Sequence, residues 1–184
     1  CSLSLEHLLL VMDKGFCSTR NINAMLDDPN KIRFVIALPF TMSFAKKQVQ
    51  SERKDIDRTE NAILVGSDLL RAVTKQRVWN QKHSLYVHVY YNVTKATKLK
   101  EDLIAHVTAL KRAAQKDPHH PQYQEDFNRY LVIRKSEKNE LGYTVNIRED
   151  VLAAELAYAG WLVLVSNHIT DNQEAIAIYR DKDV

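Results

Sequence analysis

Short apolar runs and amphipathic stretches alternate along the first part of this chain. The run Leu8–Met12 contains no polar position, which is typical of a strand that is buried on both faces. It is followed by Thr19–Leu26, where apolar residues recur at helical spacing after Ser18, a favourable helix N-cap. Ile32–Leu38 is a second apolar run, and Pro39 ends it. We therefore predict a strand–helix–strand unit with parallel strands.

The patterns in the middle of the chain are more varied. Ser43–Arg58 is highly charged, which indicates an exposed helix or a mobile segment, and Asn61–Val73 has a weak helical pattern. The clearest helix is predicted at Lys95–Lys116, where apolar residues recur every three or four positions opposite a basic and polar face. Further strands are predicted at Ser84–Tyr91, Tyr130–Arg134, Tyr143–Ile147 and Trp161–Val165. A turn at Lys138–Gly142 would join the second and third of these strands in a hairpin. Helices are predicted at Glu149–Tyr158 and from Asn172 to the last residue, Val184.

The composition is that of a globular protein with one domain or one domain that carries an insertion. Apolar residues make up 45% of the 184 residues, which is enough for a core without disulfides or metal ions. The net charge of +3 agrees with nucleic-acid binding but does not require it. Cys1 and Cys17 form no CxxC pair, and no His/Cys set has zinc spacing, so we expect reduced thiols in a cytoplasmic protein. No apolar run approaches the ~20 residues of a membrane span, so no membrane partner is expected.

Asp13 stands at the predicted end of the first strand, just before Gly15 and Phe16. In open parallel sheets, ligand sites form at the carboxyl ends of the strands. Gly15 would let the backbone turn sharply there, and Phe16 is expected to pack back under the turn. A carboxylate at a strand end suits a divalent cation such as Mg²⁺. An aspartate at this position can equally form a turn by accepting hydrogen bonds from the next backbone amides, so the residues alone leave both interpretations open.

Three elements together resemble one protein family. They are the sequence Asp-Lys-Gly-Phe before a helix, the buried run Trp-Leu-Val-Leu-Val-Ser-Asn, and a last helix that carries Tyr-Arg-Asp-Lys. The chain resembles bacterial insertion-sequence transposases of the DDE superfamily, in the branch that has an insertion in its RNase H-like domain and a Tyr-x-x-Arg-x-x-x-Glu pattern on the last catalytic helix. The resemblance covers most of the chain and is strongest at its two ends.

The resemblance implies an α/β fold, namely a partial RNase H-like (retroviral-integrase-like) fold with a mixed α+β insertion. Residues 1–42 would form the strand–helix–strand part of the catalytic core. Residues 43–160 would form the insertion, helical at first and then rich in strands. Residues 161–184 would form the last strand and a truncated catalytic helix.

The resemblance also implies roles for single residues. Asp13 would be the second of the three acidic residues of the family and a ligand of Mg²⁺ (or Mn²⁺). Tyr179 matches the tyrosine of the last-helix pattern, and Lys182 stands where arginine is usual. The first aspartate would lie upstream of Cys1, and the glutamate would lie two positions beyond Val184. The chain is therefore expected to be a fragment that holds one of three metal ligands.

By this resemblance, the parent protein cuts and rejoins double-stranded DNA at insertion-sequence ends and targets, using two metal ions that neutralise charge in the transition state. Tyr179 and Lys182 would contact a backbone phosphate. Trp161 would stack on a flipped base, the alternative being a core tryptophan. Lys95 and Lys98, among other basic residues, would follow the DNA backbone, the alternative being a solvated helix face. The family also implies a homodimer for the full-length protein and a place in the bacterial cytoplasm, at the nucleoid.

Two further interpretations stay open at this point. One is an inactive transposase remnant that at most binds DNA, since a chain with one of three acidic ligands should not cleave DNA by itself. The other is a small α/β enzyme of another kind. Against it, the four glycines form neither a dinucleotide-binding motif nor a P-loop, and no Ser-His-Asp set or nucleophile elbow is visible.

Overall fold

The computed structural model describes residues 9–30, 32–137 and 142–182, which fall into two compact units. Unit 1 contains residues 1–92 and 161–184, and unit 2 contains residues 93–160. Helices and strands are mixed in both units, so the chain is of the α/β class. Of the residues that the resemblance assigned to the insertion, 93–160 form unit 2, whereas residues 43–92 add a helix and three strands to unit 1.

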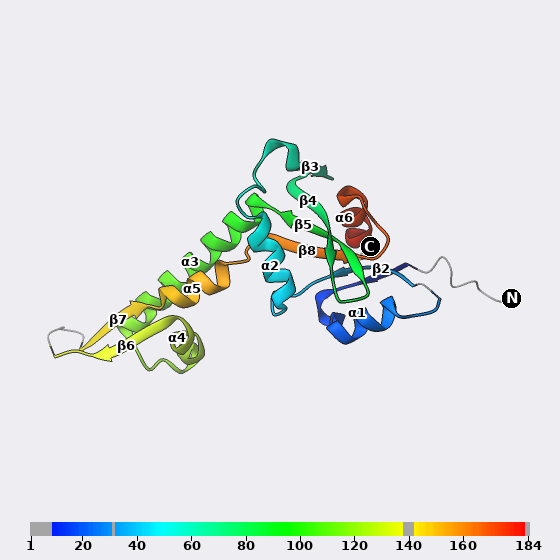
Figure 1. The fold of residues 1–184 in the computed structure, drawn as a ribbon. Coiled ribbons are helices and arrows are strands. Elements are labelled where there is room, and N and C mark those ends of the chain that lie inside the picture. The colour runs from blue at the N-terminus through cyan, green and yellow to red at the C-terminus, as the bar shows by residue number, and fades with distance from the viewer. Residues whose placement is uncertain (1–8, 31, 138–141, 183–184) are drawn as a thin grey trace. The chain divides into compact units, whose positions relative to one another are not determined.

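Unit 1 is built on a six-stranded mixed sheet (Figure 1). Its strands in spatial order are β1 (Leu9–Met12), β2 (Arg33–Ala37), β8 (Trp161–Ser166), β5 (Ser84–Tyr91), β4 (Asp68–Val78) and β3 (Ala62–Val65). β1 and β2 are parallel, and the remaining neighbours pair antiparallel. Helix α1 (Thr19–Leu26) connects β1 to β2, and the Ser18 hydroxyl accepts a hydrogen bond of 3.1 Å from the Asn21 N–H. The predicted strand–helix–strand unit and its N-cap are thus confirmed.

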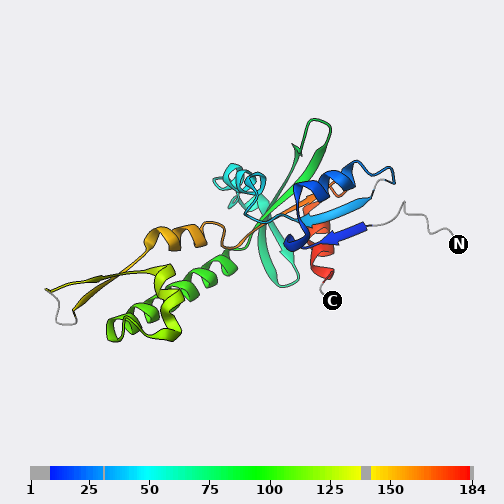
Figure 2. The ribbon, with the colours of Figure 1, turned by 90° about the horizontal axis from the view of Figure 1, so that it is seen from below.

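Helices cover both faces of this sheet. The core on one face consists of Val35, Ala37, Leu70, Ala72, Tyr90, Leu164, Ile169, Ala175 and Ile176. Ala175 and Ile176 belong to α6 (Asn172–Asp181), so α6 covers this face. Helix α2 (Ser43–Glu52) covers the other face. Its Glu52 binds Lys75 of β4. Because side chains alternate between the two faces of a strand, Lys75 points to the face opposite that of the β4 residues that lie under α6. Figure 2 shows the two helices on opposite sides of the sheet.

The weak helical pattern at Asn61–Val73 gave a wrong prediction. After a 3-10 turn, η3 (Thr59–Asn61), this segment forms the β3–β4 hairpin. Gly66 lies in the connecting turn with a φ of +61°, a left-handed conformation that favours glycine. Buried Leu70 and Ala72 recur at a spacing of two, so pairing with the neighbouring strands outweighs a weak helical preference.

The charged segment Ser43–Arg58 forms α2 over its first ten residues. Ala45 and Val49 anchor this helix in the core. The Glu52 carboxylate at its end is buried and accepts hydrogen bonds from Lys75 at 2.8 Å and from Arg77 at 3.2 Å. A buried carboxylate without such partners would be strongly destabilising, so β4 and α2 depend on each other.

Unit 2 combines a two-stranded hairpin with three α-helices. Its elements are α3 (Val93–Lys116), η4 (Pro121–Tyr123), α4 (Gln124–Tyr130), β6 (Leu131–Lys135), β7 (Tyr143–Ile147) and α5 (Glu149–Leu156). β6 and β7 pair antiparallel, which confirms the predicted hairpin, while residues 138–141 of its predicted turn lie outside the described residues. The core consists of Val107, Leu110, Ala114, Phe127, Tyr130, Leu131, Val145 and Leu152. No helix in the described part of the chain has both the length and the apolar character needed to cross a membrane.

His88 of β5 is a buried polar residue in the core of unit 1. Its Nε2 lies 3.1 Å from the carbonyl oxygen of Ile169, and its Nδ1 lies 2.8 Å from the Thr74 hydroxyl. Because a carbonyl can only accept, Nε2 carries the hydrogen and Nδ1 accepts from Thr74. Burial lowers the pKa of His88 to about 4, so the ring is neutral in the folded protein at neutral pH.

Acidification is expected to destabilise unit 1 through His88. In the unfolded chain the histidine pKa is about 6.5, so the unfolded state takes up the proton first as the pH falls. The contribution of neutral His88 to the free energy of unfolding is therefore fully present above about pH 6.5 and declines as the pH falls toward 4. The total loss is up to about 3 kcal/mol. Urea unfolding at neutral pH and near pH 4.5 measures this loss, and His88→Gln should show a smaller one. His168→Gln, which changes an exposed histidine of the same unit, should behave as the wild type. Equal losses in all three proteins would contradict the assignment.

Candidate functional site

Asp13 begins a tight turn at the carboxyl end of β1. Its Oδ1 accepts a hydrogen bond of 2.8 Å from the Lys14 N–H, and its carbonyl oxygen accepts one of 3.1 Å from the Phe16 N–H. Residues Lys14–Phe16 form the 3-10 turn η2. The turn-forming role considered for this aspartate is therefore present, and it fixes the direction of the carboxylate.

The same carboxylate also contacts the last helix of the chain. The Tyr179 hydroxyl donates a hydrogen bond of 2.7 Å to Asp13 Oδ1, across 166 positions of sequence. The Lys182 Nζ lies 3.6 Å from Asp13 Oδ2 and 4.5 Å from the centre of the Tyr179 ring. We call Asp13, Tyr179 and Lys182 the Asp13 cluster. Three residues that the family resemblance singled out thus lie together.

Helix α6 is held so that its last turn meets β1. At its start, Asp171 Oδ1 accepts a hydrogen bond of 2.9 Å from the Glu174 N–H. At its end, the Arg180 guanidinium donates to the Val65 carbonyl at 3.2 Å and to the Asp68 carboxylate at 2.9 Å. Arg180 therefore points to the β3–β4 turn, while Tyr179 and Lys182, three residues apart, face Asp13. The helix itself ends at Asp181, and the expected continuation at residues 183–184 lies outside the described residues.

The electrostatics of the cluster favour the ionised form of Asp13. The hydrogen bond from Tyr179 lowers the pKa of Asp13, and the Lys14 N–H and the Lys182 charge act in the same direction. The Asp13 side chain is 56% exposed, whereas that of Lys182 is 16% exposed. An ionised carboxylate that solvent can reach is able to bind a cation, and the adjacent ammonium group is able to bind a phosphate.

One carboxylate does not make a metal centre. Among the described residues, no group of three or more His, Cys, Asp or Glu side chains is placed to hold a metal ion. Asp13 has the right chemistry for one ligand of Mg²⁺ or Mn²⁺, but the described residues do not supply the rest of a coordination shell.

Trp161 is not available for the base stacking that the resemblance implied. Its side chain is buried, because β8 lies between β2 and β5 and places Trp161 opposite Tyr91. The two rings are stacked with centres 4.5 Å apart, and the Arg53 guanidinium lies 5.6 Å from the Trp161 ring centre. The core alternative is therefore the one that the structure supports.

Lys95 and Lys98 lie on the first turns of α3, in unit 2. Both residues are exposed, which suits either contact with DNA or a solvated helix face. They are not members of the Asp13 cluster, so the structure leaves their predicted role as it was.

One residue next to the cluster differs from what the sequence predicts. Phe16 was expected to pack under the turn, but it is 71% exposed. An aromatic residue after a buried strand usually signals packing, and only the course of the η2 turn shows otherwise.

Comparison of the chain with protein-family models, with curated proteins and with solved structures finds no match.

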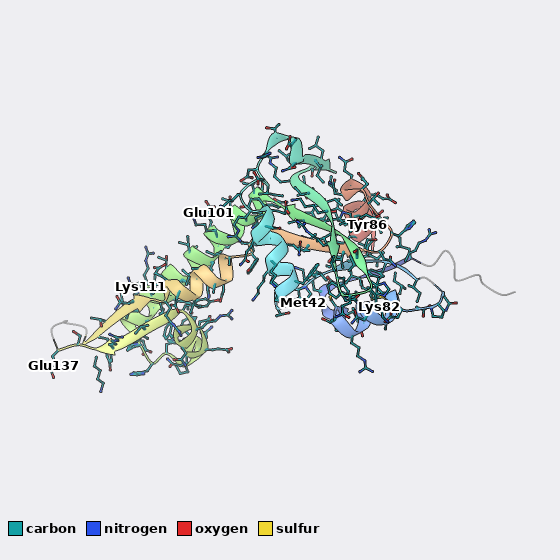
Figure 3. The ribbon with its side chains drawn as sticks, viewed as in Figure 1. Met42, Lys82, Tyr86, Glu101, Lys111 and Glu137 are labelled. Carbon is teal, nitrogen blue, oxygen red and sulfur yellow. The ribbon has the colours of Figure 1, made fainter. Side chains whose placement is uncertain are left out.

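Replacing Tyr179 by phenylalanine is expected to raise the pKa of Asp13, because the strongest interaction that favours the carboxylate is removed. NMR titration of the Asp13 carboxyl carbon measures this shift. Lys182→Met should raise the pKa less, because its charge is a weaker contribution. Tyr86→Phe, on β5 (Figure 3), is the matched control and should leave the titration unchanged. An unchanged Asp13 titration in Tyr179→Phe would show that the hydrogen bond does not form in solution.

Proposed function

We propose that this chain is part of a DDE-type insertion-sequence transposase and acts on double-stranded DNA. The observation that carries the proposal is the contact of Asp13 with Tyr179 and Lys182. The resemblance selected these residues at opposite ends of the chain, and in the fold they meet at the carboxyl end of β1. If the similarity of the two short motifs to the family were due to chance, there would be no reason for the residues that it selected to lie in contact with each other.

The fold is compatible with the architecture that the proposal requires. β1, α1 and β2 would belong to the RNase H-like catalytic core, with Asp13 at a strand end where such sites form. β8 would return the chain to that core after the insertion, since it pairs with β2. The strands β3, β4 and β5 then extend the same sheet instead of forming a separate domain.

The roles in the proposed site follow from side-chain chemistry. Asp13 would supply one oxygen ligand to Mg²⁺ or Mn²⁺, and carboxylates outside the described residues would have to supply the others. Lys182 would bind a DNA phosphate as a point charge, without the two-pronged grip of an arginine. Tyr179 would orient the Asp13 carboxylate through its hydroxyl. By itself the chain would then bind DNA without cutting it, and the protein would work at the bacterial nucleoid.

The single carboxylate also favours a second candidate, an inactive transposase remnant that only binds DNA. The two candidates agree on DNA binding by the Asp13 cluster. They differ in whether a longer protein that contains this chain cleaves DNA.

DNA binding should depend on Lys182. Neutralising one phosphate contact is expected to reduce the slope of log Kd against log salt concentration by about 0.9 for duplex DNA. Fluorescence anisotropy with a labelled duplex at several salt concentrations measures this slope for the wild type and for Lys182→Gln. Lys82→Gln is the matched control. Lys82 is exposed (Figure 3) and precedes β5, which runs in the same direction as β1, so it lies at the end of the sheet opposite Asp13. Equal slopes in all three proteins would remove Lys182 from the DNA site.

Catalysis is tested in a protein extended at both ends by its flanking coding sequence. We expect Mg²⁺-dependent cleavage of a labelled insertion-sequence end, and we expect Asp13→Asn to abolish it while DNA binding persists. Undiminished cleavage by Asp13→Asn would exclude Asp13 as a metal ligand. An extended protein that folds and binds DNA, but does not cleave it, would favour the remnant.

A further inference from the structure

The Lys182 ammonium group has two partners inside the Asp13 cluster. Its Nζ lies 3.6 Å from Asp13 Oδ2 and 4.5 Å from the centre of the Tyr179 ring, whose face attracts cations. The Lys182 side chain is 16% exposed, so little of it is presented to solvent in this arrangement. A DNA phosphate that approaches from solvent therefore meets a cation that is already bound within the protein.

The more exposed member of this ion pair is the carboxylate. The Asp13 side chain is 56% exposed, and its charge has the same sign as that of a phosphate. Because like charges repel, a phosphate that comes close to the cluster is disfavoured by Asp13. Asp13 therefore opposes the binding of DNA in two ways, since it repels the phosphate and holds the lysine that would bind it.

Lys182 is the partner that is able to move. Asp13 is fixed, because its Oδ1 accepts hydrogen bonds from the Lys14 N–H at 2.8 Å and from the Tyr179 hydroxyl at 2.7 Å. The separation of 3.6 Å between Lys182 Nζ and Asp13 Oδ2 exceeds the ~2.7–2.9 Å of a charge-assisted hydrogen bond, so the ion pair is loose. Lysine also carries its charge on a flexible stem. The Lys182 ammonium group can therefore turn from Asp13 to a phosphate while the carboxylate stays in place.

We infer that the ion pair of Asp13 and Lys182 is an autoinhibitory contact, in which Asp13 competes with DNA phosphates for the Lys182 ammonium group. Neutralising Asp13 releases Lys182 and strengthens DNA binding. The inference rests on the proposed function, since it concerns the regulation of the same DNA site. In a complete site, the binding of DNA and of a metal ion would then strengthen each other, because Lys182 leaves Asp13 in both events.

The test is a double-mutant cycle on the affinity of the chain for a short labelled duplex, measured by fluorescence anisotropy at low salt. Asp13→Asn removes the charge but keeps a side-chain oxygen that can accept from the Lys14 N–H and the Tyr179 hydroxyl. Because a solvent-accessible ion pair is weak, Asp13→Asn should tighten duplex binding by about three- to fivefold. In the Lys182→Met background, the same substitution should change the affinity by less than about twofold.

Two further variants serve as controls. Glu174→Gln removes the same charge from an exposed position at the start of α6, at the opposite end of the helix from Lys182. It should change the duplex affinity equally in the wild-type and Lys182→Met backgrounds. Asp13→Ser is a second neutral variant, whose hydroxyl can also accept from the Lys14 N–H, and it should act in the same direction as Asp13→Asn. Thermal unfolding of each variant verifies that it is folded.

The outcomes separate the inference from the proposed function. Equal tightening by Asp13→Asn in both backgrounds would show a general effect of charge. It would overturn the autoinhibitory contact and leave the DNA-binding proposal intact. Unchanged or weaker duplex binding by Asp13→Asn, in a folded protein whose wild type binds DNA, would also overturn the contact. Binding of DNA by neither the wild type nor Asp13→Asn would overturn both.

Discussion

The insertion of β8 between β2 and β5 is the constraint on which the rest of unit 1 depends. Residues Trp161–Ser166 pair with β2 on one side and with β5 on the other, so this one strand joins the first strands of the chain to the β3–β4–β5 meander. The neighbours on both sides also bury its residues, and four of the six positions, Val163 to Ser166, are fully enclosed. Without β8, neither group of strands would have its inner edge hydrogen-bonded.

The position of β8 then determines where α6 lies. The chain leaves β8 at Ser166, whose hydroxyl accepts hydrogen bonds from the N–H groups of His168 at 3.1 Å and Ile169 at 2.9 Å. The Ile169 carbonyl is bound by His88, and the Tyr90 hydroxyl donates to the Asn172 carbonyl at 2.7 Å. β5 thus holds the start of α6 through two side chains, and Arg180 holds its end at the β3–β4 turn. With both ends fixed, Tyr179 and Lys182 have a defined distance to Asp13.

The Asp13 cluster combines a structural role and a chemical one. The carboxylate closes its own turn through the Lys14 N–H and fastens α6 to β1 through Tyr179 and Lys182. The same three interactions keep Asp13 ionised, which is the state that a metal ligand requires. A cation that binds there would compete with Lys182 for the carboxylate, so the charge of Lys182 would have to be directed elsewhere, as toward a phosphate. In the proposed function, this change would let a metal ion bind Asp13 while Lys182 contacts a DNA phosphate.

The sequence by itself determined the local elements and the chemistry at their ends. Apolar runs marked β1, β2 and β8, aromatic and β-branched residues marked β5, helical spacing marked α3, and Ser18 marked the start of α1. Each of these signals depends on residues that are close in the chain. It also singled out Asp13, Tyr179 and Lys182, through a resemblance at the two ends. The tertiary structure decided what depends on distant contacts. It brought Tyr179 to Asp13, buried Trp161 against Tyr91, left Phe16 in solvent and drew residues 62–78 into strands. The physical reason is that burial and strand pairing are decided by which segments become neighbours in the sheet, and no local pattern of residues contains that information.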